Sequence, residues 1–406
     1  MNTDQSIKLK CCNLNKEGVI ILPSSKSISN RALIVNALCD TSSELFNLSE
    51  ARDTQTMITL LKNDLNTWDV KDAGTTMRFL TAFATITNQN KTLTGTTRMQ
   101  HRPIGILVDA LRDLGAEIEY KENTGFPPIE IKKFKQKTTT LNIRGDVSSQ
   151  YISALLMIAP RLPHGLTLIL EGEIGSRPYI KMTLDIMQHF GVSHTWDKDI
   201  ITISPQNYRP NELTIEPDWS AASYWYSFVA LSNNSSVLLK GLTKKSLQGD
   251  SVLAKFMAEL GVKTTFTEEG ALLTKCNHKN LFEYNFIECP DLAQTVAVLC
   301  AVKGIEVKFT GLESLKIKET DRVLALQNEL AKIGASLLEQ ENVWYLTPSE
   351  TLPKSVSINT YEDHRMAMAF APLCLLMEVE FDDQTVVRKS YPRFWKDIEK
   401  VTDSIL

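Results

Sequence analysis

The sequence predicts an α/β protein of two domains, built from about six copies of one structural unit. Three observations predict this fold class. The chain is longer than one ordinary hydrophobic core, a pattern of strands, glycines and an amphipathic helix recurs along it, and a second type of helix returns at a nearly constant interval.

Length and composition set the first limits. The chain has 406 residues, whereas single cores stop growing near ~250–300, so we expect about two domains. Hydrophobic residues make up 43% and charged residues 23%, which excludes a disordered chain or a collagen. The 44 Lys and Arg against 48 Asp and Glu give a net charge of -4. This balance argues against broad nucleic-acid binding but leaves room for a local basic pocket.

The cysteines and the start of the chain bear on location. Seven cysteines form no CxxC pair, and this odd number predicts reduced, mostly buried thiols. No apolar run reaches the ~18–20 residues that cross a bilayer. The first ten residues, MNTDQSIKLK, lack the apolar core of a signal peptide. We therefore expect a cytoplasmic protein without a membrane partner.

Four segments share one plan: a β-rich run, a glycine, a polar loop, an amphipathic helix that a second glycine closes, and a further strand. The first glycines are Gly95, Gly172, Gly241 and Gly311, and the closing ones are Gly115, Gly191, Gly261 and Gly334. In the first copy we expect Pro103 in the first helical turn, since proline suits that position. The apolar residues from Ile104 to Leu114 share one helical face, and Gly115 can end the helix in a left-handed conformation.

A second, strongly apolar helix type alternates with the first. Five of its members carry an aspartate at the start: Asp72, Asp146, Asp218, Asp291 and Asp363. Their intervals are 74, 72, 73 and 72 residues, and a sixth member begins near Ser25 without the aspartate. Any one aspartate is most simply a helix cap. Five in register favour six related units, three to a domain, with a period too long for a solenoid of ~20–45-residue repeats.

The starts of these helices are rich in cations. Those near the starts are Lys26, Arg31, Arg78, Arg102, Lys318, Arg322, Arg365 and Lys389. Buried helices that begin together present unpaired N–H groups and partial positive charge to one region. We therefore expect a positive pocket for a ligand with several negative charges, such as phosphates and carboxylates.

Polar residues at the helix starts fit such a ligand. Ser148, Ser149 and Gln150 can bond phosphate oxygens, and Thr320 is the expected N-cap of a helix through Ile333. The chain has no GxxxxGK[ST], GxGxxG, HExxH or GxSxG motif, so nothing demands a nucleotide or a metal ion. Among six histidines only His364 lies in such a polar motif, and a single histidine there is more often a structural hydrogen-bond partner.

Seven motifs occur in an order that resembles the 5-enolpyruvylshikimate-3-phosphate synthase family, and they span residues 22 to about 392. They are LPSSKSISNRAL, DAGTTMRFLTA, RMQHRPIGILVDAL, GDVSSQYISALL, SRPYI, KETDR and DHRMAMAF. The resemblance implies two similar domains, each of three βαβαββ units in an inside-out α/β barrel, with the active site in the interdomain cleft. It divides the chain into residues 1–21 plus 218–406, which contain both termini, and an inserted domain, 22–217, with most of the shikimate 3-phosphate site.

The resemblance also implies a reaction. The enolpyruvyl group of phosphoenolpyruvate moves to the 5-hydroxyl of shikimate 3-phosphate and phosphate is released, in the pathway to chorismate and the aromatic amino acids. No cofactor and no metal take part. The protein is expected to be a cytoplasmic monomer, with no nucleic-acid or membrane partner, and a target of glyphosate.

Residue roles follow from the resemblance alone. Asp291 is implied as the base, Glu319 exchanges a proton at the methylene carbon, and Lys26 and Lys318 assist. The contacts to shikimate 3-phosphate are Lys26, Ser27, Arg31, Ser148, Ser149, Gln150, Ser176, Tyr179, Asp291, Ser314 and Lys318. Those to phosphoenolpyruvate are Lys26, Gly74, Arg102, Arg322, Arg365 and Lys389, while Gln150 lies near both substrates and His364 joins the substrate-binding set.

Three positions depart from the family pattern. Asp72 stands where Asn is common, and an acid beside phosphoenolpyruvate is unfavourable unless it caps the helix or pairs with a cation such as Arg78. Ser314 replaces an Asn, and Phe79 stands where Pro is common. Gly74 keeps space for glyphosate, so we expect sensitivity to it.

Two other functions remain open at this point. The related enolpyruvyl transferase that acts on UDP-N-acetylglucosamine shares the fold and the donor, but it typically has a Cys in the loop where this chain has Thr97 to His101. A non-catalytic scaffold on the same fold would lack one of the reactive residues, and all of them are present.

Overall fold

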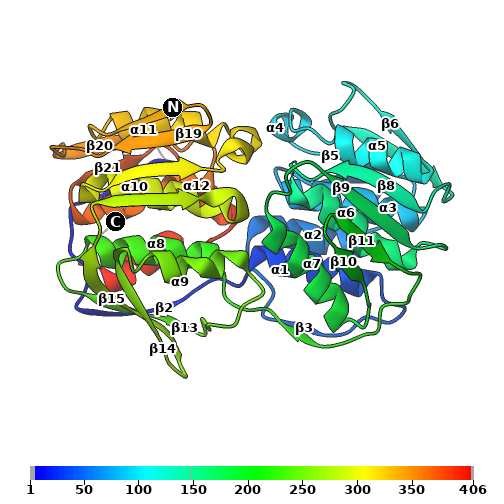
Figure 1. The fold of residues 1–406 in the computed structure, drawn as a ribbon, viewed down its shortest axis with the longest axis horizontal. Coiled ribbons are helices and arrows are strands. Elements are labelled where there is room, and N and C mark those ends of the chain that lie inside the picture. The colour runs from blue at the N-terminus through cyan, green and yellow to red at the C-terminus, as the bar shows by residue number, and fades with distance from the viewer. Residues whose placement is uncertain (1–4, 147, 404–406) are drawn as a thin grey trace. The chain divides into compact units, whose positions relative to one another are not determined.

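The computed structural model describes residues 5–146 and 148–403. The chain divides into two compact units (Figure 1). The terminal unit consists of residues 1–23 and 216–406, and the inserted unit of residues 24–215. The boundaries expected at residues 22 and 217 lie two residues from this division. Each unit buries its own hydrophobic core.

Two four-stranded sheets of the inserted unit follow the same βαβαββ path. The first is β4 (Thr67–Asp69), α3 (Gly74–Ile86), β5 (Lys91–Thr94), α5 (Gly105–Leu114), β6 (Ala116–Tyr120) and β7 (Ile129–Phe134), with the short α4 (Thr97–Gln100) before α5. The second is β8 (Thr140–Arg144), α6 (Ser149–Ile158), β9 (Leu166–Glu171), α7 (Arg177–His189), β10 (Thr195–Asp197) and β11 (Ile200–Ile203). The sheet orders are β4-β5-β7-β6 and β8-β9-β11-β10, with a parallel first pair and antiparallel others.

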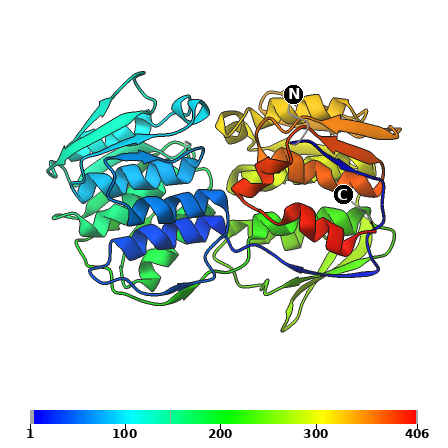
Figure 2. The ribbon, with the colours of Figure 1, turned by 180° about the vertical axis from the view of Figure 1, so that it is seen from behind.

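The third part of the inserted unit is shorter. It holds α1 (Lys26–Ala37), α2 (Arg52–Lys62) and a two-stranded parallel sheet of β3 (Leu45–Phe46) and β12 (Leu213–Thr214). Helices α1, α2 and α3 pack side by side, as the blue helices of Figure 2 show.

The terminal unit repeats this scheme. One sheet comes from β2 (Glu17–Ile21), α8 (Trp219–Leu231), β13 (Ser236–Lys240), α9 (Leu253–Phe256), β14 (Leu260–Phe266) and β15 (Gly270–His278). The next comes from β16 (Leu281–Asn285), α10 (Ala293–Lys303), β17 (Glu306–Thr310), α11 (Arg322–Ala331), β18 (Ser336–Gln340) and β19 (Val343–Thr347). The third part has α12 (His364–Phe370), α13 (Phe394–Val401) and a three-stranded sheet of β1 (Ile7–Leu9), β21 (Glu378–Phe381) and β20 (Ser355–Ile358).

The α/β fold in two similar units is thus confirmed, with two complete βαβαββ motifs and one reduced motif in each. The four glycine-marked segments are the four complete motifs, because Gly95, Gly172, Gly241 and Gly311 directly follow β5, β9, β13 and β17.

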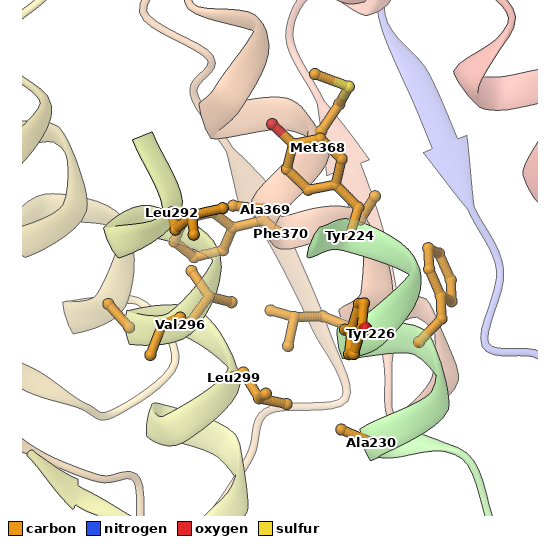
Figure 3. Close-up of a cluster of buried hydrophobic side chains, with 14 of the residues drawn as sticks. Tyr224, Tyr226, Ala230, Leu292, Val296, Leu299, Met368, Ala369 and Phe370 are labelled. Atoms are coloured by element: carbon orange, nitrogen blue, oxygen red, sulfur yellow. The ribbon is translucent and has the colours of Figure 1, made fainter. Parts of the chain in front are cut away.

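The six apolar helices form the centres of the two cores. In the inserted unit α1, α3 and α6 pack on one another, and in the terminal unit α8 and α12 both pack on α10. Figure 3 shows the second group, in which Tyr224 of α8, Val296 and Leu299 of α10 and Phe370 of α12 lie together. Because most residues of these helices are buried, their sequences show dense apolar runs rather than one apolar stripe.

Two local expectations were wrong. Pro103 lies outside α5, which begins at Gly105, because the N–H groups of Ile104 and Gly105 donate to the carbonyl of Gly125 at 2.9 and 3.1 Å. The N-cap of α11 is Asp321 rather than Thr320, since its carboxylate accepts the N–H of Leu324 at 3.0 Å, and the helix ends at Ala331. The buried face from Ile104 to Leu114 and the left-handed Gly115, with φ 117°, are as predicted.

In the part of the chain that the structure describes, no helix combines the length and apolar character needed to cross a bilayer.

Candidate active-site clusters

Charged side chains from four segments of the terminal unit form one cluster, here called the Arg322 cluster. It consists of Asp291, Lys318, Glu319, Arg322, Asp363, His364, Arg365 and Lys389. These residues come from the start of α10, the start of α11, the start of α12 and a 3-10 turn over Gln384–Lys389. Of the predicted cations in this unit, Arg365 lies at the start of the apolar helix α12, whereas Lys318 and Arg322 lie at the start of the amphipathic α11 and Lys389 lies in the 3-10 turn.

Arg322 lies at the centre of the cluster and is only 2% exposed. Its guanidinium contacts three carboxylates: Asp363 at 2.6 Å, Glu319 at 2.8 Å and Asp291 at 3.0 Å. Burial lowers the pKa of Arg322, but the three carboxylates outweigh burial and hold that pKa above its usual value. A buried cation with three anionic partners is rigidly held and stays charged.

Asp291 bridges two guanidinium groups. One carboxylate oxygen lies 3.0 Å from Nη1 of Arg322 and the other 2.8 Å from Nη2 of Arg365. Burial favours the neutral acid, but the charges of Arg365, Lys318 and Arg322 prevail and hold the pKa of Asp291 well below its usual range. In this arrangement Asp291 is a poor proton acceptor, because accepting a proton would break two strong ion pairs.

Lys318 and Glu319 lie beside this pair. Burial is the largest cause of the lowered pKa of Lys318, and the charge of Arg322 adds to it, against the opposing effect of Asp291. A lysine whose pKa is lowered can exchange protons more readily near neutral pH. Glu319 contacts both Arg322 and Lys389, whose Nζ lies 3.2 Å away, so its carboxylate is also held between two cations.

Asp363 organises the start of α12. Its carboxylate caps the helix by accepting the N–H of Arg365 at 2.9 Å, and it also binds Arg322. His364, which is buried, has Nδ1 3.4 Å from the same carboxylate. The guanidinium of Arg365 also reaches the hydroxyl of Tyr224 at 3.4 Å. Asp363 thus contacts three of the predicted substrate-binding residues without having been predicted as a functional residue itself.

Hydroxyl and amide groups gather at the helix starts of the inserted unit. Ser148 caps α6 by accepting the N–H of Gln150 at 3.4 Å, and the Gln150 amide donates to Thr75 near the start of α3 at 3.1 Å. Ser176 precedes α7 in a left-handed conformation with φ 54°, which is unusual for a residue other than glycine. Such backbone strain at a predicted phosphate contact is typical of functional sites.

Lys26 and Arg31 both belong to α1 but differ in environment. The ammonium of Lys26 lies 3.2 Å from the buried carboxylate of Asp53, at the start of α2. Arg31 is 2% exposed and donates to Thr183 at 2.7 Å, to the carbonyl of Ser27 at 3.0 Å and to Ser153 at 3.1 Å. Burial lowers the pKa of Arg31 to about 10. These internal partners make Arg31 a brace among α1, α6 and α7.

The departure at Phe79 has a structural explanation. Phe79 is fully buried, and the guanidinium carbon of Arg31 lies 5.3 Å from the centre of its ring. Tyr179, another predicted contact, lies on Arg31 at 5.9 Å. An aromatic ring is attractive to a buried guanidinium, so Phe79 stabilises Arg31 from α3.

Gly74 and Arg102 are in direct contact. A Cβ atom on Gly74 would lie 2.6 Å from Nη1 of Arg102 and 2.8 Å from its guanidinium carbon. Only glycine therefore allows the guanidinium to rest on the backbone at the start of α3. Arg102 also donates to the carbonyl of Asp72 at 3.5 Å.

Asp72 does pair with a cation, but the expected partner was wrong. Its carboxylate lies 2.7 Å from Nη2 of Arg52, whereas Arg78 donates to the carbonyls of Gly74 at 3.0 Å and Pro103 at 2.7 Å. Arg78 is buried within α3 and reaches these carbonyls directly, while the carboxylate of Asp72 pairs with the exposed Arg52, the first residue of α2.

Ser314 is one of the predicted substrate contacts, whereas Asp53 was not predicted. Ser314 lies half-buried in a 3-10 turn over Glu313–Ile317, just before Lys318. Asp53 could not be found from the sequence, because its partner Lys26 is 27 positions away and no local motif links them. Within the described residues no group of three or more His, Cys, Asp or Glu side chains is placed to hold a metal ion.

Comparisons with known proteins bear on this arrangement. A family model described as EPSP synthase (3-phosphoshikimate 1-carboxyvinyltransferase) matches residues 14–67 and 63–398. A 3-phosphoshikimate 1-carboxyvinyltransferase from Bacteroides fragilis (strain YCH46) is 49% identical over 391 residues, 95% of each chain. One from Methanospirillum hungatei JF-1 is 33% identical over 410 residues, 93% of this chain and 94% of that protein. A solved structure of EPSP synthase from Acinetobacter baumannii has the same fold, with TM-score 0.78, 16% identity and coverage of 99% and 100%.

Proposed function

Since the chain belongs to the EPSP synthase family, it transfers the enolpyruvyl group of phosphoenolpyruvate to shikimate 3-phosphate in the shikimate pathway, and we propose which of its residues carry the reaction. The Arg322 cluster supplies the proton-transfer groups and binds phosphoenolpyruvate. The helix starts of the inserted unit bind the shikimate phosphate and, through Lys26, Gly74 and Arg102, also phosphoenolpyruvate.

The observation that carries this proposal is the position of Asp291 between two guanidinium groups. Phosphoenolpyruvate brings a carboxylate and a phosphate, which are the anions that guanidinium groups bind best. When the carboxylate and phosphate of the substrate bind Arg322 and Arg365, Asp291 loses its two ion-pair partners and its pKa rises. The same binding event therefore holds the donor substrate and converts a strongly held carboxylate into a proton acceptor.

The chemistry then follows in two steps. The 5-hydroxyl oxygen of shikimate 3-phosphate attacks C2 of phosphoenolpyruvate, its proton passes to Asp291, and C3 gains a proton from the side of Glu319 and Lys318. The tetrahedral adduct loses phosphate as C3 returns a proton, which restores the double bond. Because the acid and the base reverse their roles, groups with shifted pKa values serve both steps. Lys389, Arg365 and Arg322 stabilise the charge of the adduct.

Binding of the acceptor is assigned to the inserted unit. Ser148, Ser149 and Ser176 hold the phosphate of shikimate 3-phosphate, with Gln150 between the substrates. Support comes from the hydroxyl groups at the start of α6, where N–H groups and the helix dipole favour an anion, and from the strained backbone of Ser176. Arg31 holds α1, α6 and α7 together, so we assign it to shaping this site as well as to binding.

The test is the variant Asp291→Asn, which keeps the shape of the side chain but cannot accept the proton; its single amide oxygen can accept from only one of the two arginines. Turnover, followed by released phosphate, is expected to fall by about 10²–10⁴-fold, the range for a general base. Binding of shikimate 3-phosphate, measured by calorimetry, should stay within a few-fold. Asp321→Asn is a matched control, because an asparagine also caps α11 and Asp321 lies outside the cluster. Unchanged turnover in Asp291→Asn would remove this residue from its role.

Three further properties are part of the proposal. Glyphosate competes with phosphoenolpyruvate, which a steady-state inhibition assay tests directly, and a lack of competition contradicts it. The enzyme is a monomer, which light scattering in solution tests. It works in the cytoplasm, in keeping with seven cysteines of which none forms a disulfide.

A further inference from the structure

Asp72 stands where the family pattern commonly has Asn. Its carboxylate has two partners on two different segments. One oxygen lies 2.7 Å from Nη2 of Arg52, the first residue of α2. The other accepts the hydroxyl of Thr96, the N-cap of α4, at 2.6 Å. Asp72 itself belongs to the turn between β4 and α3, so one side chain ties three segments together.

The backbone of this turn is the surface on which Arg102 rests. The guanidinium lies against Gly74, where a Cβ would come within 2.6 Å of Nη1, and it donates to the carbonyl of Asp72 at 3.5 Å. Arg102 follows α4, the helix that Thr96 begins. The hydrogen bond from Thr96 to Asp72 therefore links the segment that carries Arg102 to the segment that supports it.

Two neighbouring residues in the first turn of α2 form ion pairs with residues of this region. Arg52 neutralises Asp72, and the next residue, Asp53, holds the ammonium of Lys26 at 3.2 Å. The hydroxyl of Thr76 in α3 also donates to the carbonyl of Asp53 at 3.1 Å. Two of the cations assigned to phosphoenolpyruvate thus depend on one helical turn.

We propose that Asp72 is a positioning residue for Arg102: balanced in charge by Arg52 and bonded to Thr96, it fixes the backbone against which the Arg102 guanidinium binds phosphoenolpyruvate. This inference rests on the proposed function, in which Arg102 contacts that substrate. It also explains how an acid is tolerated near a polyanion, because Arg52 cancels its charge.

The first test compares Asp72→Ala with the wild-type enzyme. The KM for phosphoenolpyruvate is expected to rise about two- to tenfold, the range for losing an ordinary hydrogen bond. The kcat and the KM for shikimate 3-phosphate should stay within about twofold, and a general loss of folding would not produce such a split. Arg52→Ala should change the same constant in the same direction, and less so at high salt, because the pair is exposed. Glu119→Ala is the control, since it removes a similar exposed ion pair with Lys132 elsewhere in the unit.

The second test asks whether Asp72 acts through Arg102. In an Arg102→Lys background, where the forked geometry is already lost, Asp72→Ala should raise the KM for phosphoenolpyruvate no further. Effects that multiply overturn the inference. If Arg102→Lys alone leaves this KM unchanged, the proposed role of Arg102 fails. If Arg102→Lys raises it and Asp72→Ala does not, only the inference about Asp72 fails.

Discussion

Two buried aspartates of the terminal unit show how surroundings decide protonation. Asp291 is held by Arg322 and Arg365, which keep its pKa low. Asp250, 3% exposed, accepts a hydrogen bond from Ser220, and its Oδ1 has no hydrogen-bond partner among the described residues. Burial, followed by repulsion from Asp291, raises the pKa of Asp250 to about 7. Asp291 thus stays ionised, whereas Asp250 is mostly uncharged below about pH 7.

The raised pKa of Asp250 predicts a pH-dependent loss of stability. In the unfolded chain this acid ionises near pH 3.8, whereas in the folded protein it stays neutral until about pH 7. Between these pH values ionisation of the acid stabilises the unfolded state but not the folded state. The free energy of unfolding therefore falls as the pH rises. Asp250→Asn removes the penalty, and its gain in the free energy of unfolding should be about 1–3 kcal/mol larger at pH 8 than at pH 5. Urea denaturation at both pH values measures this, and an equal gain at both contradicts it.

At the residue scale the sequence was informative wherever a local motif carries the chemistry. Lys318, Glu319 and Arg322 lie within one short motif and come together in the structure. The pairs Lys26–Asp53 and Asp72–Arg52 were not foreseen, because each partner lies some twenty or more positions away and only packing of α2 brings it close. Ion-pair partners across elements are set by tertiary structure, which no local pattern encodes.

Among the elements, the glycines that follow helices are the most predictable feature. Gly115 ends α5 with φ 117°, and a Cβ there would clash with the carbonyl of Lys135. Gly172 also has a positive φ, 77°, but a Cβ there would meet nothing within 4 Å. A comparison of alanine substitutions at Gly115 and Gly172 therefore separates the free-energy cost of a left-handed backbone from the cost of a steric clash.

Gly115→Ala should destabilise the protein more than Gly172→Ala does. Both alanines adopt a left-handed conformation, which costs about 1–2 kcal/mol. Only Gly115→Ala adds steric overlap with the carbonyl of Lys135, which directly follows β7, and this costs roughly a further 1–3 kcal/mol. Chemical denaturation of both variants measures the difference, and equal losses would show that the backbone near Lys135 yields freely.

Element boundaries were less predictable than elements. Proline at 103 is suited to a first helical turn, yet the carbonyl of Gly125 takes the first N–H groups and delays α5 to Gly105. Of the five aspartates in register, Asp218 and Asp363 accept N–H groups as helix caps. Asp72, Asp146 and Asp291 pair with arginines, as Asp363 also does. A sequence repeat identifies equivalent positions, but the tertiary contacts of each copy determine whether the aspartate caps a helix or forms an ion pair.

For the whole molecule, the inserted unit is one continuous stretch and the terminal unit is made of two. The core of the inserted unit contains only residues of that stretch. In the terminal unit β2 pairs with β13 and β1 pairs with β21, so both sheets need the first 23 residues. The two units should therefore differ in their ability to fold alone.

Residues 24–215 produced alone should fold, with cooperative thermal unfolding by circular dichroism and a compact elution volume. Residues 216–406 alone should not, because β13 and β21 lose a strand partner and expose their edges. Adding residues 1–23 in trans, as a peptide, should restore part of the structure of 216–406. A folded 216–406 fragment without that peptide contradicts the prediction.

The pairing of β1 with β21 also sets an order of events during synthesis. The ribosome releases the chain from its N-terminus, so Ile7 emerges long before its partner Phe381. The inserted unit is complete long before then, and β2 meets β13 only after it. Strands β1 and β2 are therefore made early but pair with their partners late. A nascent chain that stalls before β21 has a folded inserted unit and a terminal unit whose sheets are incomplete.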